Sequence, residues 1–116
     1  MASLENIINK LVDFRKERDW EQFHNPKDLA ISLNLEDSEL LEIFQWKNVT
    51  EMDFKEGSED KERIREELAD IMNYVLLISH DLNIDIEEAA LSKINKNALK
   101  YPVEKSKGIA TKYNRL

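Results

Sequence analysis

The sequence predicts an all-α protein built as a four-helix bundle, and three observations favour this class. Apolar residues recur at helical spacing over long segments of the chain. Only two glycines and two prolines occur among the 116 residues, which is few for a β fold with many tight turns. Short links join the segments, as in helix bundles. We expect one domain over residues 1–116, in which residues 102–116 form an irregular C-terminal tail or a short turn of helix.

The first two helices are expected from their capping residues. Ser3 can accept a hydrogen bond from the first turn of a helix that runs to about Trp20. Asn25 and Pro26 start the second helix, because asparagine caps well and proline at the first helical position loses no hydrogen bond. This helix should reach about Lys47. Its apolar stripe is expected to comprise Leu29, Leu33, Leu40, Ile43 and Phe44.

The last two helices are predicted in the same way. Ser58 can cap the third helix after a loop without clear periodicity. The apolar face of the third helix is expected to comprise Ile64, Leu68, Ile71, Val75, Ile78 and Leu82. Asp85 and Glu88 give a capping-box-like start for the fourth helix, which runs to about Leu99 and cannot continue past Pro102.

Charge and composition narrow the classes of function. The formal net charge is −7, whereas a nonspecific nucleic-acid binder needs a basic surface. No cysteine occurs, so disulfides and thiolate metal sites are excluded. The sequence holds no apolar run of membrane-spanning length and no signal peptide, and we therefore expect a cytoplasmic protein without a membrane partner.

Two pairs of acidic residues occupy unexpected positions on the predicted helices. Glu36 falls within the apolar stripe of the second helix, and Glu39 lies one turn further on. Glu67 and Asp70 repeat this spacing on the flank of the third helix. Four carboxylates at one seam would repel one another, and a divalent cation such as Mg²⁺ or Mn²⁺ relieves that repulsion with the oxygen ligands it prefers. We predict that these four residues bind the metal.

The same acids are compatible with roles that involve no metal. They can be ordinary solvated acids in a chain that contains 24 of them. Glu36 can also pair with Arg15 or Arg18 of the first helix, which continue its apolar face. A di-iron site is disfavoured, because it needs a histidine three residues after a glutamate, and neither His24 nor His80 has this position.

Two further groups of side chains are candidates for binding a substrate. Lys93, Asn97 and Lys100 lie on or beside the inner face of the fourth helix, where they could hold phosphate oxygens beside a metal. The lysines can equally extend from a core surface into water. The residues that could stack on a nucleobase or hydrogen-bond to its edge are Trp20, His24, Trp46 and Tyr74, although such side chains more often pack in a core or an interface.

Several motifs taken together resemble the MazG-like nucleotide pyrophosphohydrolases, especially the dCTP pyrophosphatase branch. They are "RDWEQFHNPKDLA", "EDSELLEIFQWK", "EELADIMNYV", "KINKNALKYPV" and "KGIATKYNRL". The resemblance implies an all-α MazG-type fold that hydrolyses nucleoside triphosphates to the monophosphate and pyrophosphate with Mg²⁺, a house-cleaning reaction. Relatives are dimers or tetramers with sites built between subunits, so we expect a homodimer or homotetramer. The sequence departs from the family at Leu35 and Asp37, where many relatives have glycine.

The resemblance also assigns roles to residues of this sequence. It implies that Glu36, Glu39, Glu67 and Asp70 are metal ligands. Lys93 and Asn97 match positions that hold phosphates, and Lys100 lies beside them. Trp20, His24, Trp46 and Tyr74 match positions of the base pocket in the dCTP branch.

The mechanism that we expect assigns the catalytic role to the first acidic pair, Glu36 and Glu39. One carboxylate, Glu36 in our hypothesis, orients or deprotonates a water for in-line attack on phosphorus. The main alternative substrates are nucleotides of another base, such as dUTP or a modified cytosine nucleotide. The alternative from another class is a non-catalytic, dimeric helical interaction or regulatory module, whose acids are surface charges.

Overall fold

The computed structural model describes residues 3–116, which contain no β-strand. The α-helices of this part of the chain are α1 (Leu4–Glu17), α2 (Pro26–Phe44), α3 (Glu59–Asp81), α4 (Ile86–Lys100) and the short α5 (Val103–Ser106). Short 3₁₀ helices occur at η1 (Glu21–Phe23), η2 (Val49–Glu51) and η3 (Tyr113–Arg115). The prediction of an all-α protein is confirmed. None of the helices in residues 3–116 combines the length and apolar character needed to cross a membrane.

The chain divides into two compact units. The first ends at Asn83 and contains α1, α2 and α3, and the second, Ile84–Leu116, contains α4 and α5. The expectation of a single domain over residues 1–116 therefore stays a prediction.

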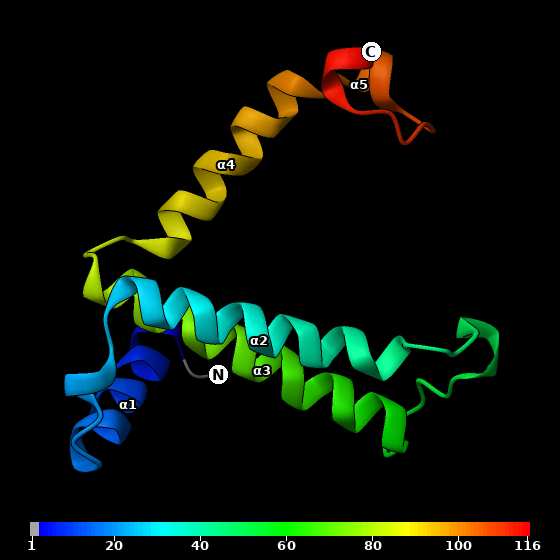
Figure 1. Ribbon diagram of the computed structural model, residues 1–116. Coiled ribbons are helices and arrows are strands. Elements are labelled where there is room, and N and C mark those ends of the chain that lie inside the picture. Colours follow the sequence, from blue (N-terminus) through cyan, green and yellow to red (C-terminus); the bar gives the residue numbers. More distant parts are fainter. Residues whose placement is uncertain (1–2) are drawn as a thin grey trace. The chain divides into compact units, whose positions relative to one another are not determined.

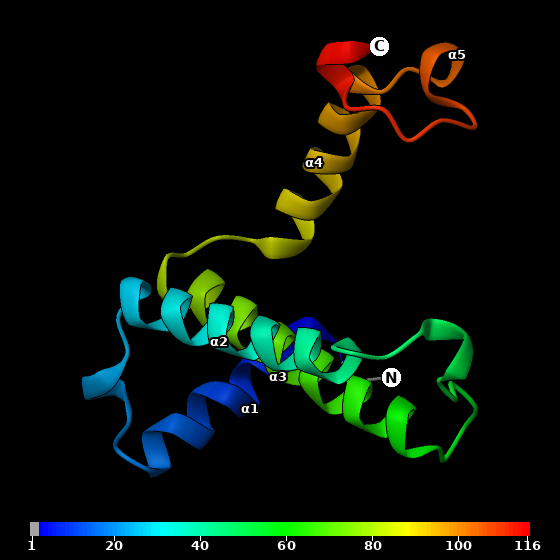
Figure 2. The same ribbon diagram turned by 45° about the vertical axis from the view of Figure 1, so that its right-hand side comes forward.

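In the first unit, α3 is the central element. It runs beside α2 over most of its length and also contacts α1 (Figures 1 and 2). The buried apolar side chains of this unit include Leu29 and Ile43 from α2 and Leu76 and Leu77 from α3, and Leu77 lies on the side of α3 that faces α1. Burial of these side chains removes apolar surface from water and holds α2 and α3 in a fixed register.

The buried face of α3 differs from the predicted one. Leu68 and Leu82 were expected in the core but are 52% and 49% exposed, whereas the adjacent residues Leu76 and Leu77 are buried. Adjacent residues on a helix point about 100° apart. Both can be buried here because the C-terminal half of α3 has two neighbours, α1 and α2, and no single stripe describes a helix that is covered on two sides.

The predicted N-caps are confirmed at all four long helices. The side chains of Ser3, Asn25, Ser58 and Asp85 each accept a hydrogen bond from the backbone N–H three residues later, at 2.9 to 3.2 Å. These bonds satisfy N–H groups that have no partner within the helix.

Two of the predicted helix ends are wrong by about one turn. The first helix ends at Glu17 instead of Trp20, and the second at Phe44 instead of Lys47. Beyond each end a residue has a left-handed backbone, Asp19 with φ 56° and Trp46 with φ 65°. A left-handed residue stops a helix, but glycine or asparagine usually has this position, so the sequence pattern did not indicate these ends.

The second unit consists of α4 and a tail that folds back on its C-terminal end (Figure 1). The rings of Tyr101 and Tyr113 contact edge to face, with centroids 6.0 Å apart. The ammonium group of Lys100 lies 4.9 Å from the centroid of the Tyr113 ring. The tail thus contains two short helical segments, α5 and η3, and has defined contacts with α4.

Candidate functional site

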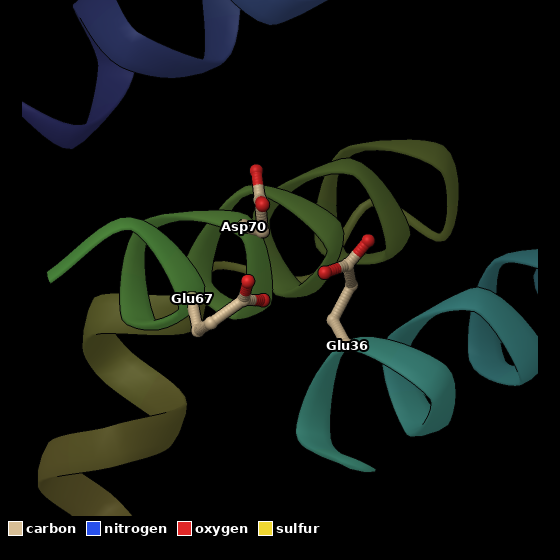
Figure 3. A group of neighbouring side chains, drawn as sticks. All are labelled: Glu36, Glu67 and Asp70. Atoms are coloured by element: carbon tan, nitrogen blue, oxygen red, sulfur yellow. The ribbon is translucent and has the colours of Figure 1, made fainter. Parts of the chain in front are cut away.

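Three carboxylates from α2 and α3 converge at the seam between these helices. Glu36 comes from α2, and Glu67 and Asp70 come from α3 (Figure 3). One oxygen of each lies within 4.8 Å of the corresponding oxygens of the other two. The packing of α2 on α3 therefore brings together three of the four residues that the sequence predicted as metal ligands.

Glu39, the fourth predicted ligand, is exposed and lies outside this group of three. It is nevertheless close enough to affect the group. A hydrogen bond and electrostatic repulsion involving Glu39 help to raise the pKa of Glu36, and both also help to raise the pKa of Glu67. Glu39 thus adds negative charge beside the cluster.

The cluster contains buried oxygens without a partner. Oε2 of Glu36 and Oε2 of Glu67 are inaccessible to water and accept no hydrogen bond within the described chain. Buried polar atoms almost always have a partner, because loss of hydration is costly. A hard divalent cation fits here, since it prefers several carboxylate oxygens at one point.

The electrostatics of the cluster agree with a cation site. Burial, followed by hydrogen bonds with Glu39 and Glu67 and repulsion by Glu39 and Asp70, raises the pKa of Glu36 to about 7. Burial also raises the pKa of Glu67. Without a cation these acids therefore bind a proton more readily than ordinary carboxylates do, and a bound cation would displace that proton.

The alternative in which an arginine neutralises Glu36 is wrong. Arg15 binds Asp81 at the end of α3, with Nη1 2.9 Å from Oδ2. Arg18 lies 3.6 Å above the ring of Phe14 and 3.7 Å from Oε2 of Glu17. Neither guanidinium group contacts Glu36.

A cavity of about 440 Å³ lies beside the carboxylates, between α1, the segment after it and α3. This volume is in the range of small-molecule sites. Its lining includes Trp20, His24 and Tyr74, which are three of the four predicted base-binding residues. The fourth, Trp46, is 95% exposed at the end of α2 and does not line the cavity.

Asp70 belongs to both features. It is part of the carboxylate cluster, and it also lines the cavity. In Figure 3 its side chain points to the side of α3 on which α1 lies. A molecule in the cavity would therefore reach the acids without leaving the protein surface.

Sequence reasoning missed several residues of the cavity. Asn73 lies on α3 between Asp70 and Tyr74 and supplies an amide to the lining. Because residues three apart are neighbours on a helix surface, the spacing from Asp70 could have indicated that Asn73 lies beside the predicted site. Arg15 also lines the cavity and contacts His24, with Nη1 3.4 Å from Nδ1. The position of Arg15 on the apolar face of the first predicted helix could have indicated that this charged side chain is buried and has a specific partner.

The predicted phosphate-binding residues belong to the second unit. Lys93, Asn97 and Lys100 are exposed, and their spacing of four and three residues places them on one face of α4. Lys100 also contacts Tyr113, as described above. A role in binding phosphate stays a prediction for all three.

Comparisons with known proteins agree with these features. The MazG-like family matches residues 31–116. dCTP pyrophosphatase 1 of Mus musculus is 40% identical over 98% of this chain and 68% of its own length, and that of Homo sapiens is 37% identical over the same shares. A pyrophosphatase from Archaeoglobus fulgidus has a similar structure, with a TM-score of 0.78 and 37% identity over 88% of this chain and 94% of its own.

These relatives confirm the predicted class of enzyme over the non-catalytic module. The chain belongs to the MazG-like family and is a nucleoside triphosphate pyrophosphohydrolase.

Proposed function

We propose that this protein hydrolyses dCTP, or a related pyrimidine deoxynucleoside triphosphate, to the monophosphate and pyrophosphate with Mg²⁺ as cofactor. The observation that carries the proposal is the position of Asp70, which joins the carboxylate cluster to the cavity. A nucleoside in the cavity would extend its phosphates toward the acids. The relatives named dCTP pyrophosphatase 1 support the choice of base.

The ligands in this proposal are Glu36, Glu67 and Asp70, with Glu39 beside them. Their oxygens suit Mg²⁺, and Mn²⁺ is the alternative cation with similar preferences. When bound, the cation neutralises charge on the phosphate oxygens and makes a water more nucleophilic at neutral pH. The unpartnered oxygens of Glu36 and Glu67 support ligation by these two residues.

Glu36 is the proposed general base. Its carboxyl group is half-buried, and without a cation its pKa is raised to about 7; a bound cation would displace the proton and leave the carboxylate free to accept one from water. A carboxylate oxygen of Glu36 takes a proton from the attacking water while the water oxygen bonds to phosphorus. The bond between phosphorus and the leaving phosphate oxygen breaks in line, and pyrophosphate departs with the electron pair. Glu39, one turn away, keeps Glu36 in position and adds to the negative charge.

The remaining contacts bind the two ends of the substrate. Lys93, Asn97 and Lys100 would neutralise charge on the departing pyrophosphate, since ammonium and amide groups donate hydrogen bonds to phosphate oxygens. Trp20 and Tyr74 would stack on the base, and His24 would hydrogen-bond to it. We also propose that the protein acts as a homodimer or homotetramer in the cytoplasm, as the sequence predicts.

A panel of triphosphates with pyrophosphate detection tests this function. We expect turnover of dCTP that requires Mg²⁺, with lower kcat/KM for dTTP, dUTP, dATP and dGTP. Glu39→Gln and Asp70→Asn should each lower kcat by at least about 100-fold, because each removes charge from the metal site. Asp37→Asn, an exposed acid between the two glutamates, is the matched control and should retain normal turnover. Near-normal release of pyrophosphate by Asp70→Asn would overturn the proposed site.

A further inference from the structure

A histidine in the cavity is held by a buried ion pair. Arg15 of α1 is 8% exposed and binds both carboxylate oxygens of Asp81 through Nη1 and Nη2. The same Nη1 lies 3.4 Å from Nδ1 of His24. Asp81 thus orients Arg15, and Arg15 in turn contacts His24. Arg15 and His24 line the cavity.

The chemistry of the guanidinium group determines where the imidazole proton lies. Arginine donates hydrogen bonds and cannot accept them. The nitrogen of His24 that faces Arg15 must therefore be the acceptor, which leaves the proton on Nε2. The hydrogen bond between Arg15 and Asp81 lowers the pKa of Asp81 and raises that of Arg15, so the pair stays charged at neutral pH.

We propose that Arg15 and Asp81 are positioning residues that hold His24 as the Nε2–H tautomer, so that His24 offers a fixed hydrogen-bond donor to N3 of a cytosine base in the cavity. This inference rests on the proposed function, which assigns the cavity to the base. N3 of cytosine is an acceptor, whereas N3 of uracil and thymine carries a hydrogen. A fixed donor at this position therefore favours cytosine over the other pyrimidines.

Two other polar side chains of the cavity, Asn73 and Tyr74, cannot make this distinction alone. The amide of Asn73 has both a donor and an acceptor end, and the hydroxyl of Tyr74 can donate or accept. Either group can rotate to suit cytosine or uracil. His24 differs because its second nitrogen is occupied by Arg15. Specificity requires a group that repels the wrong base as well as one that binds the right base, and a donor that cannot reverse meets this requirement.

The tautomer can be measured directly in the intact protein. Two-bond ¹H–¹⁵N correlation spectra distinguish protonated from unprotonated imidazole nitrogens, and the chain contains only two histidines. His24→Gln assigns the signals. We expect the wild-type protein to show a protonated Nε2 and an unprotonated Nδ1 for His24. A protonated Nδ1 of His24 in the wild type would overturn the proposal.

Variants of the ion pair test the role of Arg15 and Asp81. Arg15→Met/Asp81→Leu replaces both charges by apolar groups of similar size, a change that proteins often tolerate. We expect mixed tautomers of His24 in this double variant. Asp81→Asn, which removes one charge only, is the second variant and should show a smaller change. Lys16→Gln, an exposed cation on the same helix, is the matched control. An unchanged His24 spectrum in the double variant would exclude positioning by the pair.

Kinetics then test whether the tautomer selects the base. We expect the double variant to lower the ratio of kcat/KM for dCTP to that for dUTP by about tenfold, through KM for dCTP, with kcat within about threefold of wild type. A general packing defect would instead lower kcat for all triphosphates. An unchanged ratio would overturn the specificity role.

Failure of this inference can be separated from failure of the proposed function. If the wild-type enzyme hydrolyses no triphosphate, the proposed function is wrong, while the spectra still report the tautomer. Addition of dCMP, with dUMP for comparison, then tests base binding without turnover. We expect the His24 Nε2 signal to shift with dCMP much more than with dUMP, and an equal response to both would contradict the inference.

Discussion

At the scale of single residues, Glu36 has the most unusual chemistry in the described chain. Its pKa is raised from the usual 4.5 to about 7, first by burial and then by its acidic neighbours. In the unfolded chain the pKa returns to its usual value. The folded state therefore binds this proton more tightly, so the contribution of Glu36 to the free energy of unfolding is greatest below its usual pKa of 4.5 and is lost as pH rises through about 7.

This linkage predicts that Glu36→Gln stabilises the protein when no metal is present. A neutral amide avoids the cost of a partly buried charge, so we expect the free energy of unfolding at pH 8 to rise by about 2 kcal/mol in EDTA. At pH 5 the difference should be much smaller, because Glu36 is then protonated. Thermal or urea melts at both pH values measure the effect.

The same variant should lose its response to Mg²⁺. Ligands that bind only the folded state raise its stability, so millimolar Mg²⁺ should raise the Tm of the wild type and leave that of Glu36→Gln nearly unchanged. Asp37→Asn serves as the control and should behave as the wild type. A lower Tm for Glu36→Gln in EDTA at pH 8 would contradict the electrostatic account of the cluster.

At the scale of helices, the pair of Arg15 and Asp81 ties α1 to the end of α3. Asp81→Ala leaves a buried guanidinium group without its carboxylate, and we expect a loss of about 2 kcal/mol at pH 7 in urea melts. The contribution of Asp81 should also depend on pH. Its pKa is lowered by Arg15, so its stabilisation is present above pH 3.8, the usual value, and is lost as pH falls below that.

An exposed ion pair on the same helix is the control for this prediction. Glu17→Ala removes the partner of Arg18, whose side chain is 42% exposed. Exposed pairs of this kind contribute little, so we expect a change below about 0.5 kcal/mol. Equal effects of Asp81→Ala and Glu17→Ala would show that burial of Arg15 has no energetic consequence.

Helix starts were predictable from the sequence because their signals are local. Each capping side chain accepts a hydrogen bond from the backbone N–H three residues later, so both partners are close in the sequence. The capping residues are Ser3, Asn25, Ser58 and Asp85. Contacts distant in sequence were not predictable in this way. Arg15 and Asp81 are 66 positions apart, and no periodicity identifies one as the partner of the other.

The candidate site was predictable to the extent that it conflicts with a local rule. Glu36 was identifiable because an acid does not belong in an apolar stripe, and Glu67 and Asp70 because they repeat its spacing. Trp46 was grouped with the other predicted base-binding residues by residue type and by the resemblance to the dCTP branch, and its role in binding the base stays a prediction. Trp46 has a left-handed backbone, and its side chain is 95% exposed in the described chain. Helical periodicity contains no information on the turn that follows a helix.

At the scale of the whole molecule, exposed apolar side chains support the prediction of a homo-oligomer. The largest exposures in the first unit include Leu41 and Trp46, and those in the second include Leu99 and Val103. We expect sedimentation to give two or four times the chain mass of 13.7 kDa. Leu41→Glu should lower the assembly mass, whereas Lys27→Glu, exposed at the start of the same helix, should not. A monomer at micromolar concentration would contradict this prediction.

Asp70 belongs both to the carboxylate cluster and to the lining of the cavity. The proposed cation and the nucleotide would therefore not bind independently. Because a cation attracts phosphate oxygens, each would strengthen the binding of the other, and thermodynamic reciprocity makes the two factors equal. The free magnesium level of a cell would then set how much nucleotide the enzyme captures. After the reaction, a monophosphate presents fewer oxygens to the ion than the triphosphate did, so this mutual support weakens and the product departs.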